Sequence, residues 1–190
     1  METMEAIRQR RSIRSFRKDE IPNDVVERLL DLTIQAPSAK NDQPWRFVVT
    51  RGEAKGRLIQ KLQEVLDEEK IQGRPTGSMQ GSIRAMAEAP IVILVFNRLK
   101  REGIPEPYCY GKLLVDTQSI GAAIQTLLLG AQAMGLGTLW VCDVLYAARQ
   151  VQVFASTEDE LVAAVALGIP AESPGPRPRT GWQELTTWMD

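Results

Sequence analysis

Histidine is absent from the chain, although the sequence has 190 residues. This absence excludes the Ser-His-Asp and Cys-His nucleophile systems, because both need an imidazole as the base. It also excludes every zinc site that uses a histidine ligand, and we expect no metal centre. Any chemistry must therefore come from other groups.

Cysteine is nearly as scarce, since Cys109 and Cys142 are the only two and match no CxxC spacing. So few cysteines exclude a disulfide scaffold, and their large apolar or aromatic neighbours predict buried free thiols in a reducing cytosol. Residues 1–11 carry charges of both signs and lack the apolar run of a signal peptide. We therefore expect a cytoplasmic protein.

A strong charge of either sign is also missing, because 23 basic residues face 24 acidic ones and the net charge is -1. Such a balance supplies no overall field for drawing the protein onto nucleic acid or an anionic membrane. We expect neither partner, and any basic site must be local.

One long segment, residues 117–142, contains no charged residue and is long enough to span a bilayer. However, Gln118, Gln125 and Gln132 recur at seven-residue spacing, and Gly135 and Gly137 interrupt the run. This pattern predicts a buried helix that ends in a glycine cap at Gly135, with its polar stripe satisfied inside the protein.

The remaining composition is that of a globular protein, with 44% hydrophobic and 25% charged residues. No linker divides the chain, so residues 1–190 are expected to form one domain. Apolar periodicity predicts further helices over residues 3–9 (capped by Thr3), 22–37, 53–70 and 144–154. Strands are predicted over residues 45–50, 90–96, 138–142 and 161–167. This alternation indicates an α/β or α+β fold with one mixed sheet between helices.

The other segments are predicted to be irregular. Residues 73–81 and 97–111 have the composition of loops. The tail, residues 170–190, begins rich in proline and glycine, is expected to be extended, and must be held in place by contacts.

Basic side chains gather in two places. The basic segment, residues 10–16, contains three arginines and a hydroxyl within five residues: Arg10, Arg11, Ser12 and Arg14. Arg177 and Arg179 form a second pair, and alternation in an extended chain aims both side chains the same way. Each cluster suits either a phosphate or a solvated surface, and the sequence does not show that the two converge.

The polar loop, residues 37–45, is dense in amide and hydroxyl groups between two prolines. Amide side chains donate and accept hydrogen bonds at once, which suits the edge of a heterocycle. A loop whose side chains satisfy its own backbone explains the same composition equally well. Gly135-Leu136-Gly137 superficially resembles a dinucleotide-binding fingerprint. It lacks the third glycine and follows a helix, so it is not a Rossmann motif.

Four blocks of sequence resemble the FMN-dependent nitroreductase family, in the family's order and over nearly the whole chain. They are RRSIRSF at residues 10–16, APSAKNDQPWRF at 36–47, GLGT at 135–138, and GIP at 168–170 with the two tail arginines. The resemblance implies a three-layer α+β fold and an intertwined homodimer with two FMN sites at the subunit interface. It also implies that NADH or NADPH supplies the electrons.

The resemblance further implies a role for each matching residue. The FMN phosphate and ribityl chain would be held by Arg10, Arg11, Ser12, Arg14, Arg177 and Arg179. The partner subunit's loop would approach the flavin with Pro37 and Ser38, and hydrogen-bond its pyrimidine side or ribityl oxygens with Asn41 and Gln43. The isoalloxazine ring would lie along Thr138, Leu139 and Trp140. Flavin carries the hydride, so no catalytic side chain is assigned.

The implied activity is ping-pong reduction of a small acceptor, such as a nitroaromatic, quinone or enone. Residues 141–146 depart from the sequence that is commoner in the family. This departure leaves a non-catalytic FMN storage or sensor module as an alternative. Flavin-fragmenting and dehalogenating enzymes use the same fold and are further alternatives. Tyr108 and Tyr110 either stack on an acceptor or pack within the protein.

Overall fold

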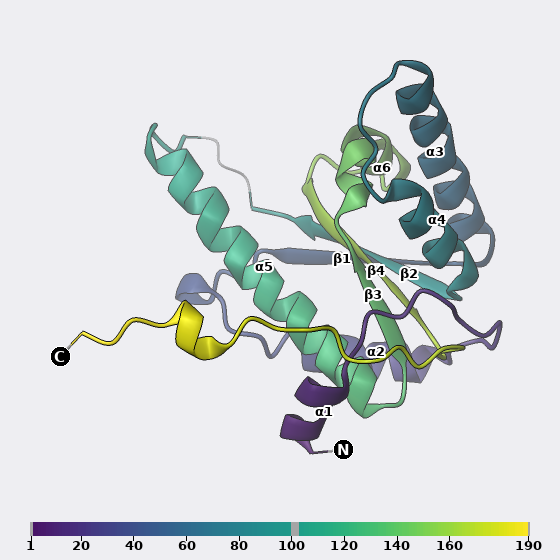
Figure 1. Cartoon of the computed structure of the whole chain (residues 1–190). Coiled ribbons are helices and arrows are strands. Elements are labelled where there is room, and N and C mark those ends of the chain that lie inside the picture. The colour runs from purple at the N-terminus through teal and green to yellow at the C-terminus, as the bar shows by residue number, and fades with distance from the viewer. Residues whose placement is uncertain (1, 100–102, 190) are drawn as a thin grey trace.

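The computed structural model describes residues 2–99 and 103–189 (Figure 1). The α-helices are α1 (Thr3–Gln9), α2 (Asn23–Thr33), α3 (Gly52–Ile71), α4 (Met79–Glu88), α5 (Tyr108–Ala133) and α6 (Ala148–Phe154). The strands are β1 (Trp45–Arg51), β2 (Ile91–Asn97), β3 (Gly137–Val141) and β4 (Glu160–Gly168). Short 3₁₀ helices are η1 (Ala39–Asn41), η2 (Asp143–Ala147) and η3 (Trp182–Leu185).

The strands form one sheet in the order β1-β2-β4-β3. Its inner strands are the continuous apolar runs, and β2 is buried at every position, as expected for a strand covered on both faces. All three strand pairings are antiparallel, so the prediction of a mixed sheet was wrong for these strands. The described residues pair in parallel at one isolated bridge, between Ser12 and Thr138.

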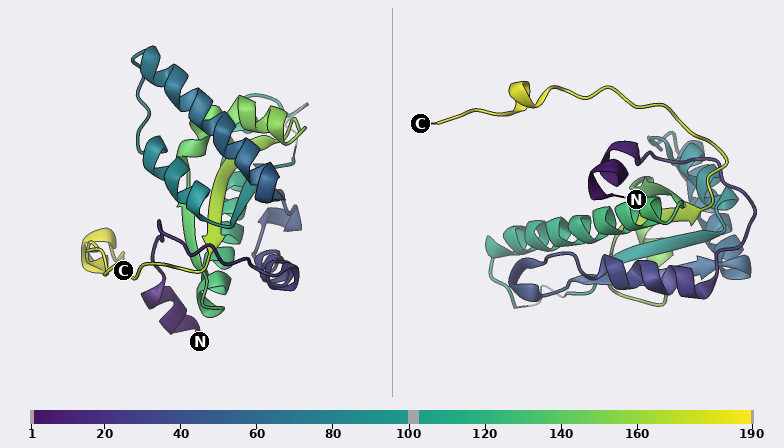
Figure 2. Two further views of the ribbon diagram at one scale, coloured as in Figure 1. Left: turned by 90° about the vertical axis from the view of Figure 1, so that its right-hand side faces the viewer. Right: turned by 90° about the horizontal axis from the view of Figure 1, so that it is seen from below.

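Helices cover both faces of the sheet, which confirms the predicted three-layer α+β architecture (Figure 2). Successive residues of β2 point to opposite faces, so Leu94 and Phe96 pack with α3, α4 and α6. Ile93 and Val95 pack instead with α2 and α5. The sheet therefore separates two apolar clusters, and each helical layer buries its apolar side against one of them.

α5 is the longest helix, and by length and composition it alone among the described helices is long and apolar enough to cross a membrane. Its Ile120, Ile124 and Leu127 are fully buried against the sheet and α2, which places one face in the core. Gln118 and Gln125 are exposed on this single chain, so the prediction that the stripe is satisfied internally was wrong. Gly135 has φ 76°, as the predicted cap requires.

Several predicted boundaries need correction. α4 begins at Met79, inside the segment predicted as a loop. The helix was not predicted because Gly81 and polar residues separate its buried positions and weaken the helical pattern. α5 begins at Tyr108, inside the other predicted loop, whose residues 100–102 lie outside the described residues. The helix predicted over 144–154 divides into η2 and α6.

The ends of the first helices also differ from prediction. α1 has Glu2 as its N-cap, without a capping side-chain hydrogen bond, so Thr3 is the first helical residue and not the cap. α2 ends at Thr33, before the predicted stop at residue 37. The side chain of Thr33 is buried and donates to the Leu29 carbonyl at 2.7 Å.

The basic segment lies between β3 and the start of the tail. Ile13 N donates to Thr138 O at 2.9 Å, and Ala171 N donates to Ser15 O at 3.0 Å. This close approach requires glycine at residue 168, because a Cβ there would lie 2.9 Å from Phe16 Cδ1, as well as 2.5 Å from Pro90 Cδ. The fold thus fixes the backbone that carries the arginines.

Beyond this anchor the tail runs clear of the layers (Figures 1 and 2). It is extended apart from η3, as predicted for its composition. Four large apolar side chains of the tail are strongly exposed: Trp182 at 60%, Leu185 at 73%, Trp188 at 77% and Met189 at 93%. A soluble chain rarely leaves so much apolar surface in water unless another surface covers it.

Candidate functional site

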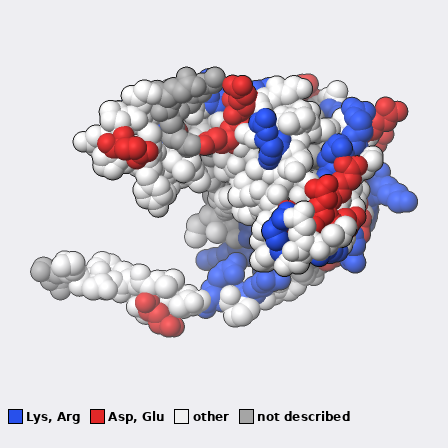
Figure 3. Space-filling model, turned by 90° about the horizontal axis from the view of Figure 1, so that it is seen from above, with Lys and Arg blue, Asp and Glu red and all other residues white. Residues whose placement is uncertain are grey.

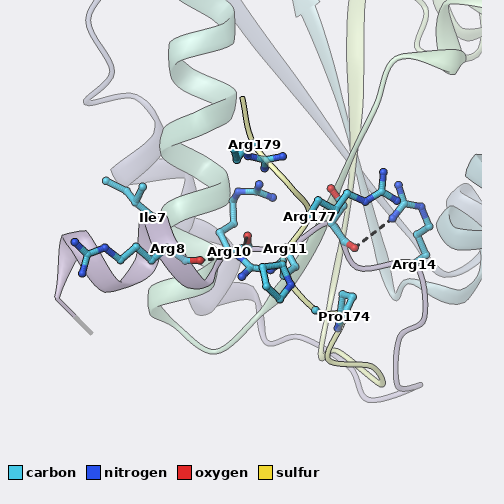
Figure 4. Close-up of a pocket in the computed structure, with 11 residues that line it drawn as sticks. Ile7, Arg8, Arg10, Arg11, Arg14, Pro174, Arg177 and Arg179 are labelled. Carbon is cyan, nitrogen blue, oxygen red and sulfur yellow. Dashed lines mark hydrogen bonds between the residues drawn. The ribbon is translucent and has the colours of Figure 1, made fainter. Parts of the chain in front are cut away.

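The two arginine clusters converge on one pocket, which Figure 4 shows. This arginine pocket has a volume of about 360 Å³ and lies between the basic segment and the tail. Its polar lining consists of Arg8, Arg10, Arg11, Ser12, Arg14, Arg177 and Arg179. The sequence left this convergence open, and the fold provides it by bonding the basic segment to the base of the tail.

The pocket is strongly electropositive. The pKa of the Arg10 guanidinium is lowered from its ordinary value, first by burial and then by the charges of Arg179 and Arg11. Figure 4 shows Arg10 extending toward Arg179, while Arg8 points away from the other arginines. None of the described lining residues is acidic. The pocket therefore has the charge that a phosphate ester would neutralise.

Lys and Arg side chains also gather at the point where the tail leaves the body of the molecule (Figure 3). Glu172 lies beside them, but its Oε1 accepts hydrogen bonds from the backbone N–H groups of Arg14 and Ser15. The carboxylate therefore anchors the tail to the basic segment. It forms no described ion pair with the pocket arginines.

Arg11 has a structural role and also carries an unused hydrogen-bond donor. Its Nη1 donates to the carbonyls of Arg8 at 2.7 Å and Arg10 at 2.9 Å, which satisfies oxygens at the end of α1. Its Nε is buried and has no hydrogen-bond partner among the described residues. Because a buried unpaired donor is costly, this atom fits a site that an anion completes.

The edge of β3 adjoins the basic segment. Thr138 is buried at 3% exposure, and the parallel bridge to Ser12 shows that its carbonyl faces the outer edge of the sheet. Because alternate residues of a strand share a direction, the Trp140 N–H and carbonyl face the same edge. Trp140 is 38% exposed, and its ring lies on the α5 side.

Leu139 differs from its two neighbours. Its side chain packs in the apolar cluster beneath α3 and α6. The three predicted ring contacts are therefore divided between the two faces of the sheet, as strand alternation requires. Thr138 and Trp140 present their side chains on one face, and Leu139 would reach a ligand at this edge through its backbone alone.

Residues 141–146, which depart from the family pattern, follow directly. Cys142 is exposed and Cys109 is partly buried, so the prediction of two buried thiols was wrong. Burial of the sulfur and the charge of Asp143 raise the pKa of the Cys142 thiol, although a hydrogen bond from Trp140 acts in the opposite direction. At neutral pH this thiol stays protonated, which makes it a weak nucleophile.

Asp143 has a structural role that its sequence context does not indicate. Its Oδ2 accepts hydrogen bonds from the hydroxyls of Ser78 and Ser82, the latter at 2.8 Å. These contacts pin the start of α4 onto η2 beside the end of β3. Ser78 and Ser82 are four residues apart, as on one helix face, but nothing in the sequence pairs them with a residue so distant along the chain.

The polar loop has an unusual backbone. Lys40, Asn41 and Gln43 have positive φ values of 53°, 57° and 46°, a conformation that non-glycine residues rarely adopt. Ser38 Oγ accepts the Gln43 N–H at 3.0 Å, and Gln43 Nε2 donates to Asn41 Oδ1 at 3.3 Å. The loop therefore satisfies part of its own backbone, as one of the two predicted alternatives required.

The fold does not bring the polar loop to the arginine pocket of the same chain. Ala39 N donates to Ser119 Oγ at 3.3 Å in the middle of α5, whereas Arg11 and Gln132 share a cavity near the end of this helix. The rise of a helix places residues 119 and 132 about 20 Å apart. None of the described residues lining the arginine pocket belongs to the loop.

The sequence matches the profile of the nitroreductase family over residues 7–169. A Rhodospirillum rubrum relative named 5,6-dimethylbenzimidazole synthase is 32% identical over 188 residues, which cover 92% of this chain and 85% of the relative. A Methanothermobacter thermautotrophicus protein with a provisional NADH dehydrogenase/NAD(P)H nitroreductase name is 30% identical over 181 residues, covering 93% and 82%.

Among solved structures, a provisionally named Desulfovibrio desulfuricans nitroreductase in complex with FMN has a TM-score of 0.75 and 30% identity. The match covers 100% of this chain and 98% of that chain. A BluB-like flavoprotein from Clostridium difficile 630 has a TM-score of 0.83 at 22% identity, over 100% of both chains. That second likeness is one of fold.

Proposed function

Because the chain belongs to the nitroreductase family, we propose that it is an FMN-dependent oxidoreductase that uses NADH or NADPH to reduce a small organic acceptor. The resemblance inferred from four sequence blocks is confirmed. The observation that carries the proposal is the convergence of the basic segment and the tail arginines on one pocket. Names of relatives, including an FMN complex at 30% identity, support the cofactor assignment.

The residues present fit the phosphate end of FMN. Arg10, Arg14, Arg177 and Arg179 would surround the phosphate, and the Ser12 hydroxyl would add a hydrogen bond. The unpartnered Nε of Arg11 is the donor that such an anion would satisfy. Charge-assisted hydrogen bonds of this kind contribute about 1.5 to 3 kcal/mol each.

The remaining flavin contacts would come from two chains. Thr138, Leu139 and Trp140 would line the ring with the edge of β3, through side chains or backbone groups. Pro37, Ser38, Asn41 and Gln43 do not line the arginine pocket of their own chain. We propose that the polar loop of a second subunit supplies these residues, which makes the homodimer necessary for a complete site.

Two exposed apolar surfaces support the homodimer. The outward side of α5 leaves Tyr108, Tyr110 and Leu114 exposed, with exposed fractions of 69%, 66% and 42%. The two tyrosines therefore do not pack within their own chain. The tail adds Trp182 and Trp188. A tail that wraps its partner would bury these side chains, each worth about 1.5 to 3 kcal/mol.

Bound FMN would supply the redox chemistry, which is transfer of a hydride from the nicotinamide to an acceptor. The protein's part is to bind and orient. The arginines hold one end of the cofactor, the β3 edge presents backbone hydrogen-bonding groups to the ring, and Trp140 covers part of this edge. No side chain is assigned as a general acid. We propose ping-pong kinetics, for which double-reciprocal plots at several acceptor concentrations would be parallel.

The direct test is an anaerobic absorbance spectrum of the purified protein, recorded before and after NADH or NADPH is added. A yellow protein that bleaches on addition of either nicotinamide is the expected result. A yellow protein that resists both would favour a storage or sensor module. A colourless protein that FMN cannot reconstitute would contradict the proposal.

A second candidate is flavin fragmentation, favoured by the 32% identity to the Rhodospirillum rubrum synthase. The dimethylated benzene ring of that enzyme's product matches the one in flavin. Incubation of the reduced holoprotein with oxygen, followed by chromatography, separates the two activities. A reductase returns FMN intact, whereas a fragmenting enzyme consumes FMN and releases 5,6-dimethylbenzimidazole.

We also propose that residues 1–190 act as one FMN-binding domain located in the cytoplasm. The single sheet, with an apolar cluster on each face, supports one domain. Near-equal numbers of basic and acidic residues give no reason to expect nucleic-acid or membrane binding.

A further inference from the structure

A buried ion-pair cluster at the start of α5 has no part in the site described so far. Asp116 is 1% exposed, and its Oδ1 contacts Lys112 Nζ one helical turn away. Asn97, at the end of β2, donates from Nδ2 to Asp116 Oδ2 at 3.4 Å. The cluster thus ties α5 to the sheet through a carboxylate that water does not reach.

Such a carboxylate is costly unless it is paired. A buried charge loses its hydration and needs an opposite charge or hydrogen-bond donors to compensate. Replacing a buried ion pair with apolar residues of similar volume is often neutral or stabilising. The charge of Lys112 therefore needs an explanation beyond stability, and its second contact supplies one.

Lys112 also reaches the polar loop. Its Nζ lies 3.5 Å from Oδ2 of Asp42, between the two amide residues assigned to the flavin. Ser119 lies seven residues further along α5, on the same face, and its hydroxyl accepts the Ala39 N–H at 3.3 Å. One face of α5 therefore holds the loop at two points.

The backbone of the loop needs such support. Three non-glycine residues with positive φ within four positions each carry strain, and such backbone persists only where surrounding contacts determine it. Arg98 adds a third anchor, because its Nε donates to the Gln43 carbonyl at 3.1 Å. Without these contacts, Asn41 and Gln43 would sample other conformations.

We infer that Lys112 and Asp116 are positioning residues, which hold Asp42 and thereby the polar loop in the conformation that receives flavin. The buried carboxylate fixes the lysine ammonium, and the ammonium fixes the loop. The inference rests on the proposed function, since it assigns the loop to a flavin site. It adds that cofactor affinity depends on a side-chain cluster that does not touch the cofactor.

The test compares FMN dissociation constants of three variants, with visible circular dichroism of the bound flavin as a second readout. Asp42→Asn removes the loop's negative charge. The double variant Lys112→Met with Asp116→Asn removes the cluster without leaving a buried unpaired charge. Lys112→Arg keeps the positive charge. Lys61→Met, which breaks the exposed Lys61–Glu64 pair, is the matched control.

We expect Asp42→Asn and the double variant each to weaken FMN binding about tenfold, the scale of a coupled ion-pair contact. All three substitutions together should weaken it no further, because they remove one and the same interaction. Lys112→Arg should retain most of the FMN affinity of the parent chain, and Lys61→Met should leave that affinity unchanged. The visible dichroism of the flavin should change only in the variants that bind FMN more weakly.

The inference is overturned if the cluster variants fold and bind FMN as tightly as the parent chain. Additive losses would also overturn it, because they would mean that Asp42 acts without Lys112. Failure of the proposed function has a different signature. In that case the parent chain binds no FMN, or Arg10→Ala leaves its affinity unchanged.

Discussion

The arginine pocket and the polar loop differ in how they would bind a ligand. In the pocket the backbone belongs mostly to no helix or strand, but it carries no positive φ and is held by bridges to β3 and the tail, and the side chains converge without acidic partners. In the loop the backbone is strained, and the side chains already bond to one another and to α5. The difference follows from the ligand chemistry that each would meet.

A phosphate presents several negatively charged oxygens, so flexible guanidinium groups can bind it from several angles. A heterocycle presents donors and acceptors at fixed positions, so its partners must be held in place before it arrives. Ligand affinity would therefore depend on charge in the pocket and on conformation at the loop. The largest losses should therefore follow removal of pocket charges.

The first prediction concerns the pair at the centre of the pocket. Arg10→Ala combined with Arg179→Ala should weaken FMN binding at least about a hundredfold, since each charge-assisted contact contributes about 1.5 to 3 kcal/mol. Titration of the apoprotein with FMN measures this loss. Arg84→Ala, which removes an exposed arginine on α4, serves as the control. An unchanged affinity would remove both arginines from the site.

The second prediction concerns the tail. Trp182→Ser together with Trp188→Ser should weaken the homodimer at least about a hundredfold, because each buried aromatic is worth about 1.5 to 3 kcal/mol. Sedimentation over a dilution series measures the change. FMN affinity should decline in parallel, as the loop of the partner is lost. A dimer of undiminished stability would show that another surface holds it together.

The third prediction concerns the backbone beneath the pocket. Gly168→Ala should lower the free energy of unfolding by about 1 to 3 kcal/mol, because the new Cβ meets Pro90 and Phe16 in a packed region. Gly175→Ala is the matched control, since a Cβ there meets no atom within 4 Å. Urea unfolding of both variants checks the difference. Equal stabilities would mean that the close approach is not required.

Much of this architecture was predictable from the sequence, for reasons that particular residues show. Residues 91–96 form an apolar run after Pro90, and its strand length and β-branched content favour a strand covered on both faces. Gly135 ends α5 because glycine favours the positive φ of a helix cap. Arg177 and Arg179 point into one pocket because alternation in an extended chain dictates it.

Other features depend on contacts between distant residues and escaped prediction. The convergence of Arg10 with Arg179 requires the tail to return past β3, which no local pattern encodes. α4 was missed because Gly81 and the polar residues between its buried positions weaken the helical pattern. The strained loop satisfies no propensity rule, since its positive φ values are imposed by α5 and Arg98.

The central claim is that one flavin site needs the arginine pocket of one chain and the polar loop of another. Mixing two inactive variants, Arg10→Ala with Arg179→Ala in one chain and Asn41→Ala with Gln43→Ala in the other, tests it most directly. In a mixed dimer, one site receives both defects and the other receives none. We predict that reassembled mixtures regain FMN binding at one site per mixed dimer, together with nicotinamide oxidation. Mixtures no more active than either variant alone would contradict the account, because a site contained within one chain cannot be restored by its partner.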